Sequence, residues 1–391
     1  MYASQHKTTN HADVIVIGAG VLGTFHAYFA AQMGLKTILI ERNSFPSDAS
    51  TRNFGMVVQT IVETVGEWPI FASASRDIYL SIQEELDIGV QGNGSLYIAS
   101  TEIERAVLLD FAQMYSQAFH CMYLDAEEAL YRYPFIQASY CSGALHFPDD
   151  LTLDPRRLLR QFIPHIVQKG LIDYIPQTTV VSITSSDQQC VVQDAVGNMF
   201  LSDQVFVCCG ADYRTLFPEY FRASGLRICK LQMMQTEPQP KYTLPHAILS
   251  GLSIRRYPAF KSTPSYSFLE VEPVDERIRS HGIHLLFKQT ADGSVIIGDS
   301  HEYSAFQDAH TSQEYTNCYI NETILQYGQQ MLALPSWQIK TMWNGYYLIH
   351  PEQEIYTETI NDRIHIVTGI AGKGMSTGPG FAQKHIASKL R

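Results

Sequence analysis

The sequence predicts an α/β fold in which a discontinuous domain, built on a largely parallel sheet, is interrupted by an inserted α+β domain with a largely antiparallel sheet. Three observations predict it. A buried strand near the start runs into a glycine-rich turn at residues 18–23. Another strand, near the end, runs into a second glycine-rich loop at residues 369–378. Between them, residues 230–298 contain strand-like stretches with interspersed aromatic residues.

Length, charge and cysteine usage exclude several classes of protein. The 391 residues predict two or three domains, or one elaborate α/β body. A formal net charge of −11 argues against a nucleic-acid-binding protein. No apolar run is long enough for a membrane span, and the polar opening residues do not resemble a secretory signal. The seven cysteines form no C-x-x-C pair, so we expect no metal site and a reducing, cytoplasmic location.

A β-α-β unit opens the chain. Residues 13–17 form a β-branched run with the continuous hydrophobicity of a buried parallel strand. A helix is predicted through Met33, with Gly34 just beyond its end, and residues 36–40 form the second strand. The complete unit is typical of nucleotide-binding α/β domains.

The first glycine turn has the Gly-x-Gly-x-x-Gly spacing of a Rossmann-like dinucleotide site. Gly18 permits the tight turn, Gly20 lets the backbone approach a pyrophosphate, and Gly23 lets the helix pack closely on the strand. The helix N-terminus offers free N–H groups to phosphate oxygens. Glu41, at the end of the second strand, is placed to accept hydrogen bonds from a ribose. The motif alone leaves FAD and NAD open.

Helices and strands alternate through the rest of the chain. Asp154 and Pro155 have the residue types of a helix N-cap and a first helical position. Helices are predicted over residues 71–85, 102–119 and 155–167, and from Phe381 onward. Strands are predicted over residues 95–99, 179–183, 190–193, 204–208 and 363–368. The stretches 230–271 and 282–298 are interpreted as mostly strand, which places Arg255, Arg256 and Tyr257 on one strand and Lys288 on the next.

The second glycine-rich loop indicates that the C-terminal residues complete the first domain. The nucleotide-binding domain is predicted over residues 1–85, 150–222 and 335–391. The substrate-binding domain is predicted over residues 86–149 and 223–334. An NAD-dependent dehydrogenase is the less favoured alternative, because a single nucleotide-binding unit would not require the chain to return.

Three further segments carry a resemblance to a known family. The strand at residues 204–208 ends in Cys209-Gly210-Ala211, Val180 lies in Thr-Val-Val-Ser-Ile, and the last glycine loop contains Gly372-Lys-Gly-Met375. Together with the front motif, these segments resemble the D-amino-acid oxidase superfamily of FAD-dependent amine oxidoreductases, which includes glycine and sarcosine oxidases. The resemblance covers nearly the whole chain and implies FAD as the cofactor.

Four short motifs resemble a narrower bacterial branch of that superfamily, associated with phosphonate catabolism. They are Thr51-Arg-Asn-Phe-Gly-Met-Val57, Cys229-Lys-Leu-Gln-Met-Met234, Gly298-Asp-Ser-His-Glu-Tyr303 and Gly372-Lys-Gly-Met375. Members of that branch oxidise aminoethylphosphonate, or its N-methyl derivative, to phosphonoacetaldehyde. Residues 58–62 depart from the branch pattern, in which a Trp-Pro and a Gly-Gln follow the Asn-Phe-Gly segment. By resemblance this segment lies near the flavin and the substrate.

The front motif and the resemblance together give a set of FAD-binding residues. They are Gly18, Gly20, Val21, Leu22, Gly23, Glu41, Arg42, Ser50, Thr51, Arg52, Asn53, Gly55, Met56, Val180, Gly210, Gly372, Lys373, Gly374 and Met375. For Arg52 the alternative is an ordinary ion pair. Sarcosine-type relatives attach their flavin to a cysteine shortly before the final strand. The last cysteine here is Cys318, so non-covalent FAD is expected.

Amine oxidation by a flavin requires a neutral amine and stabilisation of the charge that develops on the reduced ring. Lys373, with a helix beginning near Pro379, is the candidate for stabilising that charge, and a surface lysine is the alternative. Lys288 and His301 are the other catalytic candidates, although a lone histidine is more often structural.

An anionic head group on the substrate would need a cation. On a strand only one of Arg255 and Arg256 can face a pocket, and Arg256, followed by Tyr257, is preferred over the alternative that both face solvent. Trp343 and Tyr346 are expected to supply an aromatic wall, although core packing would use the same residue types.

The sequence therefore predicts an FAD-dependent oxidoreductase that oxidises a small, anionic primary or secondary amine. Hydride transfer to flavin N5 and imine hydrolysis would give an aldehyde, with aminoethylphosphonate or its N-methyl derivative as the favoured substrate. The alternatives are a glycine, sarcosine or D-amino-acid oxidase, and a flavoprotein partner without its own substrate. O2 or another acceptor would reoxidise the flavin, and a monomer or a homodimer is expected.

Overall fold

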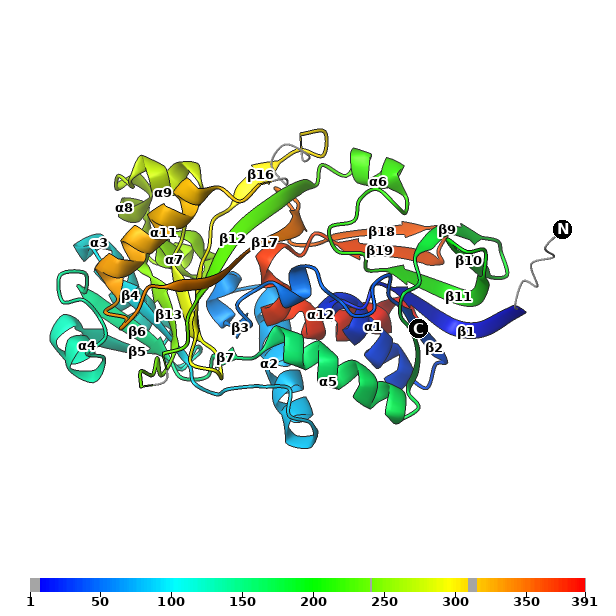
Figure 1. Ribbon diagram of the computed structural model, residues 1–391, viewed down its shortest axis with the longest axis horizontal. Coiled ribbons are helices and arrows are strands. Elements are labelled where there is room, and N and C mark those ends of the chain that lie inside the picture. Colours follow the sequence, from blue (N-terminus) through cyan, green and yellow to red (C-terminus); the bar gives the residue numbers. More distant parts are fainter. Residues whose placement is uncertain (1–7, 240, 309–314, 391) are drawn as a thin grey trace.

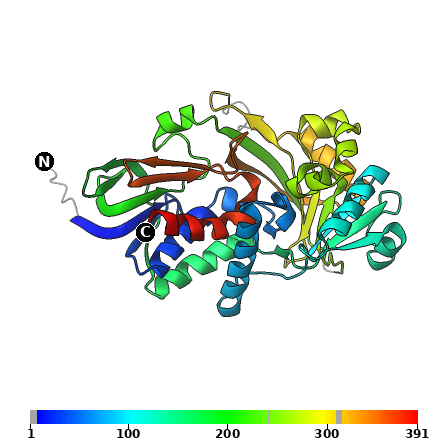
Figure 2. The same cartoon turned by 180° about the vertical axis from the view of Figure 1, so that it is seen from behind.

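Two sheets, each with its own helices, lie side by side along the long axis of the molecule (Figures 1 and 2). The computed structural model describes residues 8–239, 241–308 and 315–390. We call the part around the sheet of β1, β2, β8–β11, β18 and β19 the first lobe. The part around the sheet of β4–β6 and β12–β17 is the second lobe.

The sheet of the first lobe takes strands from distant parts of the chain. Its order is β18-β19-β11-β1-β2-β8, with β10 pairing with β11 and β9 pairing with β10. β1 runs parallel to β2 and to β11, and β11 runs parallel to β19. The bounds are β1 Thr8–Ile17, β2 Thr37–Ile40, β8 Ile172–Ile175, β9 Val180–Ser185, β10 Cys190–Asp194, β11 Met199–Val207, β18 Tyr356–Ile360 and β19 Ile364–Thr368.

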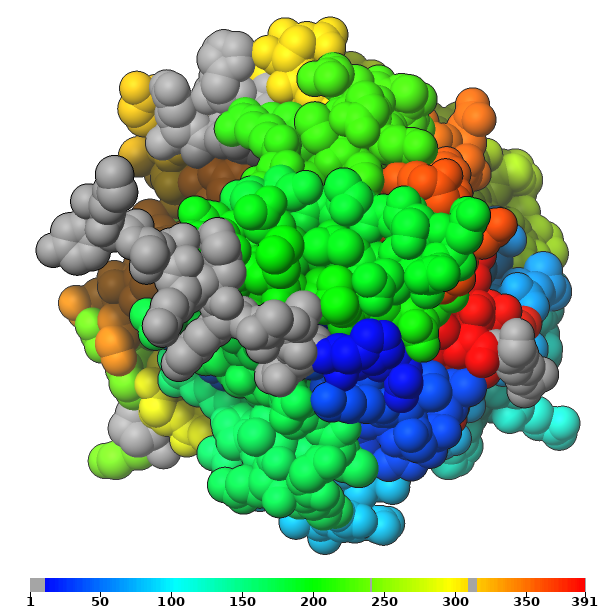
Figure 3. Space-filling view, turned by 90° about the vertical axis from the view of Figure 1, so that its right-hand side faces the viewer, coloured from blue at the N-terminus to red at the C-terminus, as the bar shows by residue number. Residues whose placement is uncertain are grey.

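Both faces of this sheet are covered, which explains the continuous hydrophobicity of residues 13–17. Val14 and Val16 pack with residues of α1 (Val21–Gln32), α5 (Pro155–Gln168) and α12 (Gly374–Lys389). Ile15 and Ile17 pack on the other face with residues of β9, β10 and α6 (Pro218–Ala223). α2 (Trp68–Glu85) lies against α12. Figure 3 looks onto the end of the lobe, where the β8–β11 region lies beside the N-terminal strand.

The sheet of the second lobe is largely antiparallel, as predicted. Its order is β16-β12-β15-β14-β13-β4-β6-β5, with β17 pairing with β12, and the β13–β4 pair is parallel. The strand bounds are β4 Ser95–Ala99, β5 Met122–Asp125, β6 Gly143–Phe147, β12 Arg227–Thr236, β13 Ala247–Ser250, β14 Leu286–Gln289, β15 Val295–Gly298, β16 Glu302–Ser304 and β17 Ile339–Ile349. The helices are α3 Glu102–Tyr115, α4 Ala126–Arg132, α7 Gly251–Arg256, α8 Tyr266–Val271, α9 Glu276–Ser280 and α11 Cys318–Met331. Short elements complete the fold: β3 Met56–Val57, β7 Leu151–Thr152, η1 Ala49–Thr51, η2 Gln59–Ile61, η3 Pro258–Ser262 and η4 Ala371–Lys373.

The predicted strand at residues 255–257 is wrong. Arg255 and Arg256 end α7, and Tyr257 follows that helix. The buried Ile254 packs with apolar residues of α3 and β4, so tertiary contacts stabilise a single helical turn that sequence periodicity cannot distinguish from a strand. Lys288 lies on β14, as a strand residue, but not on a strand next to these arginines.

The final helix begins earlier than predicted, at Gly374 rather than near Pro379 or Phe381. Its glycines serve close packing: a Cβ on Gly380 would lie 2.4 Å from the carbonyl oxygen of Phe71 in α2. Packing therefore overrides the poor helix propensity of this segment. The predicted helix over residues 102–119 ends at Tyr115, and the predicted N-cap Asp154 accepts hydrogen bonds from the N–H groups of Arg156 and Arg157.

The first domain was predicted to resume at residue 335, but the next strand, β17, belongs to the second lobe. It pairs with β12 along almost its whole length. The rest of that segment, β18, β19 and α12, belongs to the first lobe. Within the described residues, no helix has the length and apolar character that crossing a membrane would take.

Candidate active site

A central cavity lies between the two lobes and adjoins a narrower cavity in the first lobe. The central cavity is lined from the first lobe by the glycine turn, by residues 49–61 and by residues 368–375, and from the second lobe by α7, β12 and β17. The narrower one, which we call the nucleotide cavity, is lined by Gly18, Glu41 and Val180, among others. Gly20, Ser50 and Ala211 belong to both walls, so the two cavities are adjacent.

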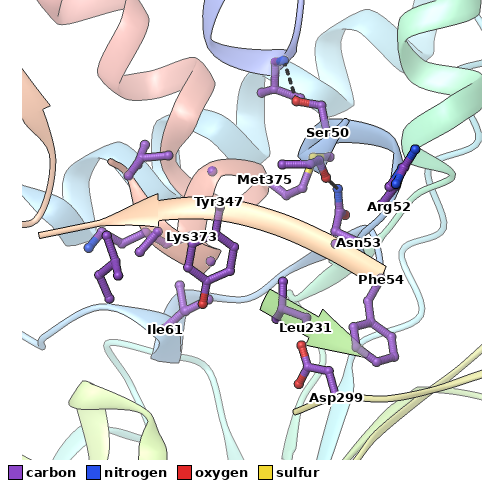
Figure 4. A pocket seen from close by; sticks show the side chains of 18 of the residues that line it. Ser50, Arg52, Asn53, Phe54, Ile61, Leu231, Asp299, Tyr347, Lys373 and Met375 are labelled. Carbon is purple, nitrogen blue, oxygen red and sulfur yellow. Dashed lines mark hydrogen bonds between the residues drawn. The ribbon is translucent and has the colours of Figure 1, made fainter. Parts of the chain in front are cut away.

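The glycine turn has the close approaches that its spacing predicts. A Cβ on Gly23 would lie 1.8 Å from the carbonyl oxygen of Gly18, so only glycine lets the helix pack there. A Cβ on Gly20 would lie 2.9 Å from the Ser50 hydroxyl and would reduce the space in both cavities. The Ser50 hydroxyl itself accepts a hydrogen bond from the N–H of Val21 at 2.9 Å (Figure 4). Leu22 also lines the central cavity.

Acidic and basic side chains stand at the far end of the nucleotide cavity. The buried Glu41 carboxylate accepts hydrogen bonds from the N–H groups of Ala19 at 2.9 Å and Asn43 at 3.0 Å. These bonds fix the carboxylate at the wall where a ribose was expected. Arg42 lines the same cavity and pairs with Asp48 at 2.8 Å and with Asp212 at 2.9 Å.

Residues 50–56 form one wall of the central cavity, with Thr51 as the exception. Arg52 donates to the carbonyl oxygens of Ser47 at 2.8 Å and Asn344 at 3.2 Å, and makes no ion pair within the described part of the chain. Asn53 donates to the carbonyl oxygen of Ala49 at 2.9 Å. Gly55, with φ +70°, and Met56 also line the cavity, with Gly210 across from them on the β11 loop. Thr51 lines a different cavity, described below.

The closing loop presents its backbone to the central cavity through Gly372, Lys373, Gly374 and Met375. The ammonium group of Lys373 pairs with Glu354 and lies 4.9 Å from the ring centre of Trp68. Burial lowers the pKa of Lys373, although Glu354 opposes that shift. Its charge is thus partnered by Glu354, and its role in stabilising a reduced flavin stays a prediction.

A polar cluster occupies the second-lobe side of the central cavity. Arg256 donates a hydrogen bond to the hydroxyl of Tyr303 at 2.9 Å. Burial acts against its charge, but Tyr347, Tyr303 and Asp299 outweigh burial and raise the pKa of Arg256. Arg255, by contrast, points away and pairs with Glu104 and Glu272. Arg256 is therefore the arginine of this pair that lines the cavity.

Asp299 lies in the same cluster between two histidines. Its Oδ1 is 2.9 Å from Nε2 of His284, and its Oδ2 is 3.9 Å from Nε2 of His301. Burial alone would raise the pKa of Asp299, but His301, His284 and Arg256 hold that pKa below its ordinary value. Burial and the nearby Arg256 charge keep the pKa of His301 well below its ordinary value. The cavity therefore contains a buried carboxyl group between two imidazole rings.

Aromatic and aliphatic side chains complete the central cavity. Tyr257, Tyr346 and Tyr347 line it, and Tyr347 extends below β17 on the side where Asp299 lies (Figure 4). Phe54, Leu231 and Ile61 add apolar surface. Val58 and Ile61 belong to the segment that departs from the phosphonate-branch pattern, so this departure lies in the cavity wall.

Two of the predicted catalytic and substrate-binding residues lie elsewhere. Lys288 and Trp343 line a side cavity together with Thr51 and Arg156. The ammonium group of Lys288 donates to the carbonyl oxygen of Leu153, and burial lowers the pKa of Lys288 to about 8. Trp343 donates to the carbonyl oxygen of Arg52 at 3.2 Å. Lys288 therefore lines the side cavity and not the central cavity that Arg256 lines.

Sequence reasoning gave no site role to Asp299, His284 or Tyr303, whereas Tyr347 belongs to the segment from Trp343 that was expected to form an aromatic wall. Asp299 is two residues before His301, so alternation along an extended segment was a usable signal for it. Tyr303 is next in the same alternation. The β14–β15 hairpin brings His284 opposite Asp299. Tyr347 comes to the site because β17 pairs with the distant β12.

The cavities fit a long dinucleotide. Their walls run from Glu41 and Val180, past the glycine turn, to the backbone of residues 372–375. This fold and site define a dinucleotide-binding oxidoreductase with a separate substrate lobe. The profile of the FAD dependent oxidoreductase family, DAO, matches residues 13–388, and the chain belongs to this family. FAD is therefore its cofactor, as predicted, whereas its non-covalent attachment stays a prediction.

Similar proteins agree with this assignment. The glycine oxidase of Bacillus licheniformis is 29% identical over 192 residues, which are 47% of this chain and 50% of the relative. The chain thus spans about half the length of that curated relative. The crystal structure of glycine oxidase from Geobacillus kaustophilus has a TM-score of 0.77 at 17% identity, covering 98% of this chain and 96% of that one. The FAD-bound L-alpha-glycerophosphate oxidase from Mycoplasma pneumoniae has a TM-score of 0.75 at 16% identity, covering 97% of this chain and 95% of that one. These structures confirm the predicted fold class.

Proposed function

We propose that this protein is an FAD-dependent oxidoreductase that oxidises a small, anionic primary or secondary amine to an aldehyde. The favoured substrate is 2-aminoethylphosphonate or its N-methyl derivative. FAD supplies a hydride acceptor, and the imine that forms is hydrolysed in water.

The observation that carries this proposal is the state of Arg256. Its guanidinium lines the central cavity and donates to Tyr303, but pairs with no carboxylate among the described residues. A partly buried guanidinium that lines a cavity favours a bound anion, and its planar fork matches a phosphonate or a carboxylate. The four short motifs of the phosphonate branch favour the phosphonate.

The remaining residues would position the substrate and exclude water. Tyr257 and Tyr347 offer ring faces and hydroxyl groups, and Phe54 and Leu231 offer apolar surface. The backbone of residues 372–375, at the start of α12, would hold the flavin ring with N–H groups and a partial positive charge. His301 is proposed as a catalytic residue, Tyr346 as part of the aromatic wall, and Lys373 as a cofactor-binding residue through its backbone.

A glycine-oxidase-type activity is the second candidate. It is favoured by the relative from Bacillus licheniformis and by the position of Val58 and Ile61 in the cavity wall, where the phosphonate branch has other residues. The carboxylate of the amino acid would bind Arg256 in place of a phosphonate. A flavoprotein partner without its own substrate is disfavoured by the charged cluster in the cavity.

Anaerobic bleaching of the flavin tests the proposal. The panel contains 2-aminoethylphosphonate, its N-methyl form, glycine, sarcosine, proline and several D-amino acids. Fast bleaching by the phosphonates alone supports the favoured substrate, and fast bleaching by the amino acids alone transfers support to the second candidate. A flavin that none of these amines bleaches contradicts both. Oxygen uptake after bleaching would identify O2 as the acceptor.

The free thiols of the described cysteines favour a cytoplasmic location.

A further inference from the structure

Asp299 and His301 form a part of the central cavity wall that carries hydrogen-bond acceptors, in contrast to the positively charged Arg256. These acceptors lack donors. Oδ1 of the buried Asp299 accepts no hydrogen bond from any described residue. Nε2 of His284 lies 2.9 Å from this oxygen as an ion-pair contact. Leaving a buried carboxylate oxygen without a donor is costly, so the arrangement calls for a donor that is not part of the described chain.

His301 adds a second acceptor to this wall. Its Nδ1 lies 3.1 Å from the carbonyl oxygen of Gly282 and must carry the proton, because a carbonyl only accepts. In the neutral ring Nε2 is therefore a lone pair, and it lies 3.9 Å from Oδ2 of Asp299. Two acceptors this close, inside a secluded cavity, require a donor or a cation between them.

Arg256 does not supply that donor. It forms no ion pair with Asp299, although the two charges are near enough to shift each other's pKa values. The guanidinium of Arg256 donates a hydrogen bond to the hydroxyl of Tyr303 instead. The central cavity thus has a cationic donor group and an anionic acceptor group that remain separate from each other.

We propose that Asp299 and His301 form the subsite that binds the ammonium group of a dipolar substrate whose anionic group binds Arg256. An ammonium has three N–H donors and one positive charge, which matches two carboxylate oxygens and one imidazole nitrogen. This inference rests on the proposed function and adds a requirement to it: the substrate must carry both charges. An uncharged amine, or an anion without an amine, satisfies only one end of the cavity.

The same contact prepares the amine for oxidation. The anionic group of the substrate first neutralises Arg256, whose charge helps to hold down the pKa of His301. The substrate ammonium then gives one proton to Nε2 of His301: the N–H bond breaks, the new Nε2–H bond forms, and the nitrogen keeps its electron pair. Asp299 then faces a positively charged imidazole and stabilises it. The amine is left neutral, which is the form that donates hydride.

The experiment uses the FAD-loaded enzyme and ligands that cannot be oxidised, because the carbon next to nitrogen bears no hydrogen. The first pair is (2-amino-2-methylpropyl)phosphonate and (2,2-dimethylpropyl)phosphonate, in which a methyl group replaces the ammonium. The second pair, 2-aminoisobutyrate and 2,2-dimethylpropanoate, makes the same comparison for carboxylates. Binding is followed by the shift of the flavin absorption band. One of the two pairs should bind to the native enzyme. Within that pair, the ammonium member should bind about 10- to 100-fold more tightly than the methyl member, as expected for charge-assisted hydrogen bonds.

Asp299→Asn should remove most of that preference and leave the affinity for the methyl member nearly unchanged. His301→Gln is the second variant, in case the first does not fold, and Asp173→Asn, at an exposed carboxylate on β8, is the control. An unchanged preference in folded, flavin-loaded Asp299→Asn and His301→Gln overturns the inference. So does a native enzyme that does not discriminate within either pair. Both results are distinct from failure of the proposed function, which is shown by a native flavin that no amine bleaches.

One other occupant must be tested. Ligating atoms of His284, Asp299 and His301 all lie within 4.8 Å of one another, a set that also suits a metal ion. Elemental analysis of the purified enzyme should find no stoichiometric metal, and treatment with EDTA should leave the ligand preference unchanged. One equivalent of a transition metal that is lost in Asp299→Asn would overturn the ammonium assignment, and with it the prediction of no metal site.

Discussion

Replacing Arg256 with Gln tests the anion site most directly. The change keeps a side chain of similar length and a hydrogen-bond donor for Tyr303, but it removes the charge and the guanidinium fork. If an anionic substrate takes two charge-assisted hydrogen bonds from Arg256, their loss should cost about 2–3 kcal/mol after water takes over part of the contact. That is about a 30- to 150-fold loss in kcat/KM. Arg256→Lys keeps the charge without the fork and should lose about 5- to 10-fold.

The assay is anaerobic stopped-flow bleaching of the flavin against amine concentration, which separates the Kd from the limiting rate. Arg256→Gln should raise the Kd of the anionic amine and change the limiting rate less. The neighbouring Arg255 is the matched control. It is 15% exposed and pairs with the buried Glu104, so Arg255→Gln should lower the Tm and leave the Kd nearly unchanged. If folded Arg256→Gln binds every anionic amine as the native enzyme does, the reasoning is refuted.

Four further predictions concern the cofactor, stability and the side cavity. Gly23→Ala places a Cβ 1.8 Å from the carbonyl oxygen of Gly18 and should yield protein without FAD, seen as loss of the 450 nm band relative to 280 nm; full flavin content would contradict it. Native enzyme precipitated with acid should release its FAD into the supernatant, whereas flavin that stays with the denatured chain would show a covalent bond. Burial lowers the pKa of His26 to about 4, so between pH 6.5 and 4 the unfolded chain binds a proton that the folded chain does not. His26 alone should then lower the free energy of unfolding by about 3 kcal/mol as pH decreases through that range, and urea titrations of His26→Gln should show a shallower slope. Lys288→Met should leave the Kd of anionic amines within about 2-fold, because Lys288 lies in the side cavity; a loss like that of Arg256→Gln would contradict this placement.

Local sequence patterns predicted the parts of the fold that depend on short-range physics. The strand at residues 13–17, the glycine turn and the Asp154 cap each need only neighbouring residues, and each is found as predicted. The strand assigned to Arg255 and Arg256 failed, because a single turn of helix leaves no periodicity to detect. The segment from Gly374 was also misread, since its glycines reflect the close approach of α2.

The candidate site was less accessible from sequence. Arg256 was selected from an incorrect strand but lines the cavity, because two adjacent side chains point apart in a helix as well as in a strand. Lys288 and Trp343 were grouped with it, yet β14 and β17 direct them into the side cavity. Tyr347 reaches the site because β17 pairs with the distant β12, which no local motif records, whereas His284 is brought to Asp299 by the local β14–β15 hairpin.

The packing of α12 has a consequence for the order of events in the cell. Its residue Gly380 donates to Ser75 of α2 at 2.9 Å, and the hydroxyl of Tyr79 in α2 donates to the carbonyl oxygen of Met375 at 3.1 Å. β19, the strand before it, completes pairing with β11. A ribosome therefore exposes the glycine turn of residues 18–23 long before the residues that close its cavity exist. The central cavity is complete only when synthesis has passed the start of α12, and until β19 is made the edge of β11 that it covers stays unpaired.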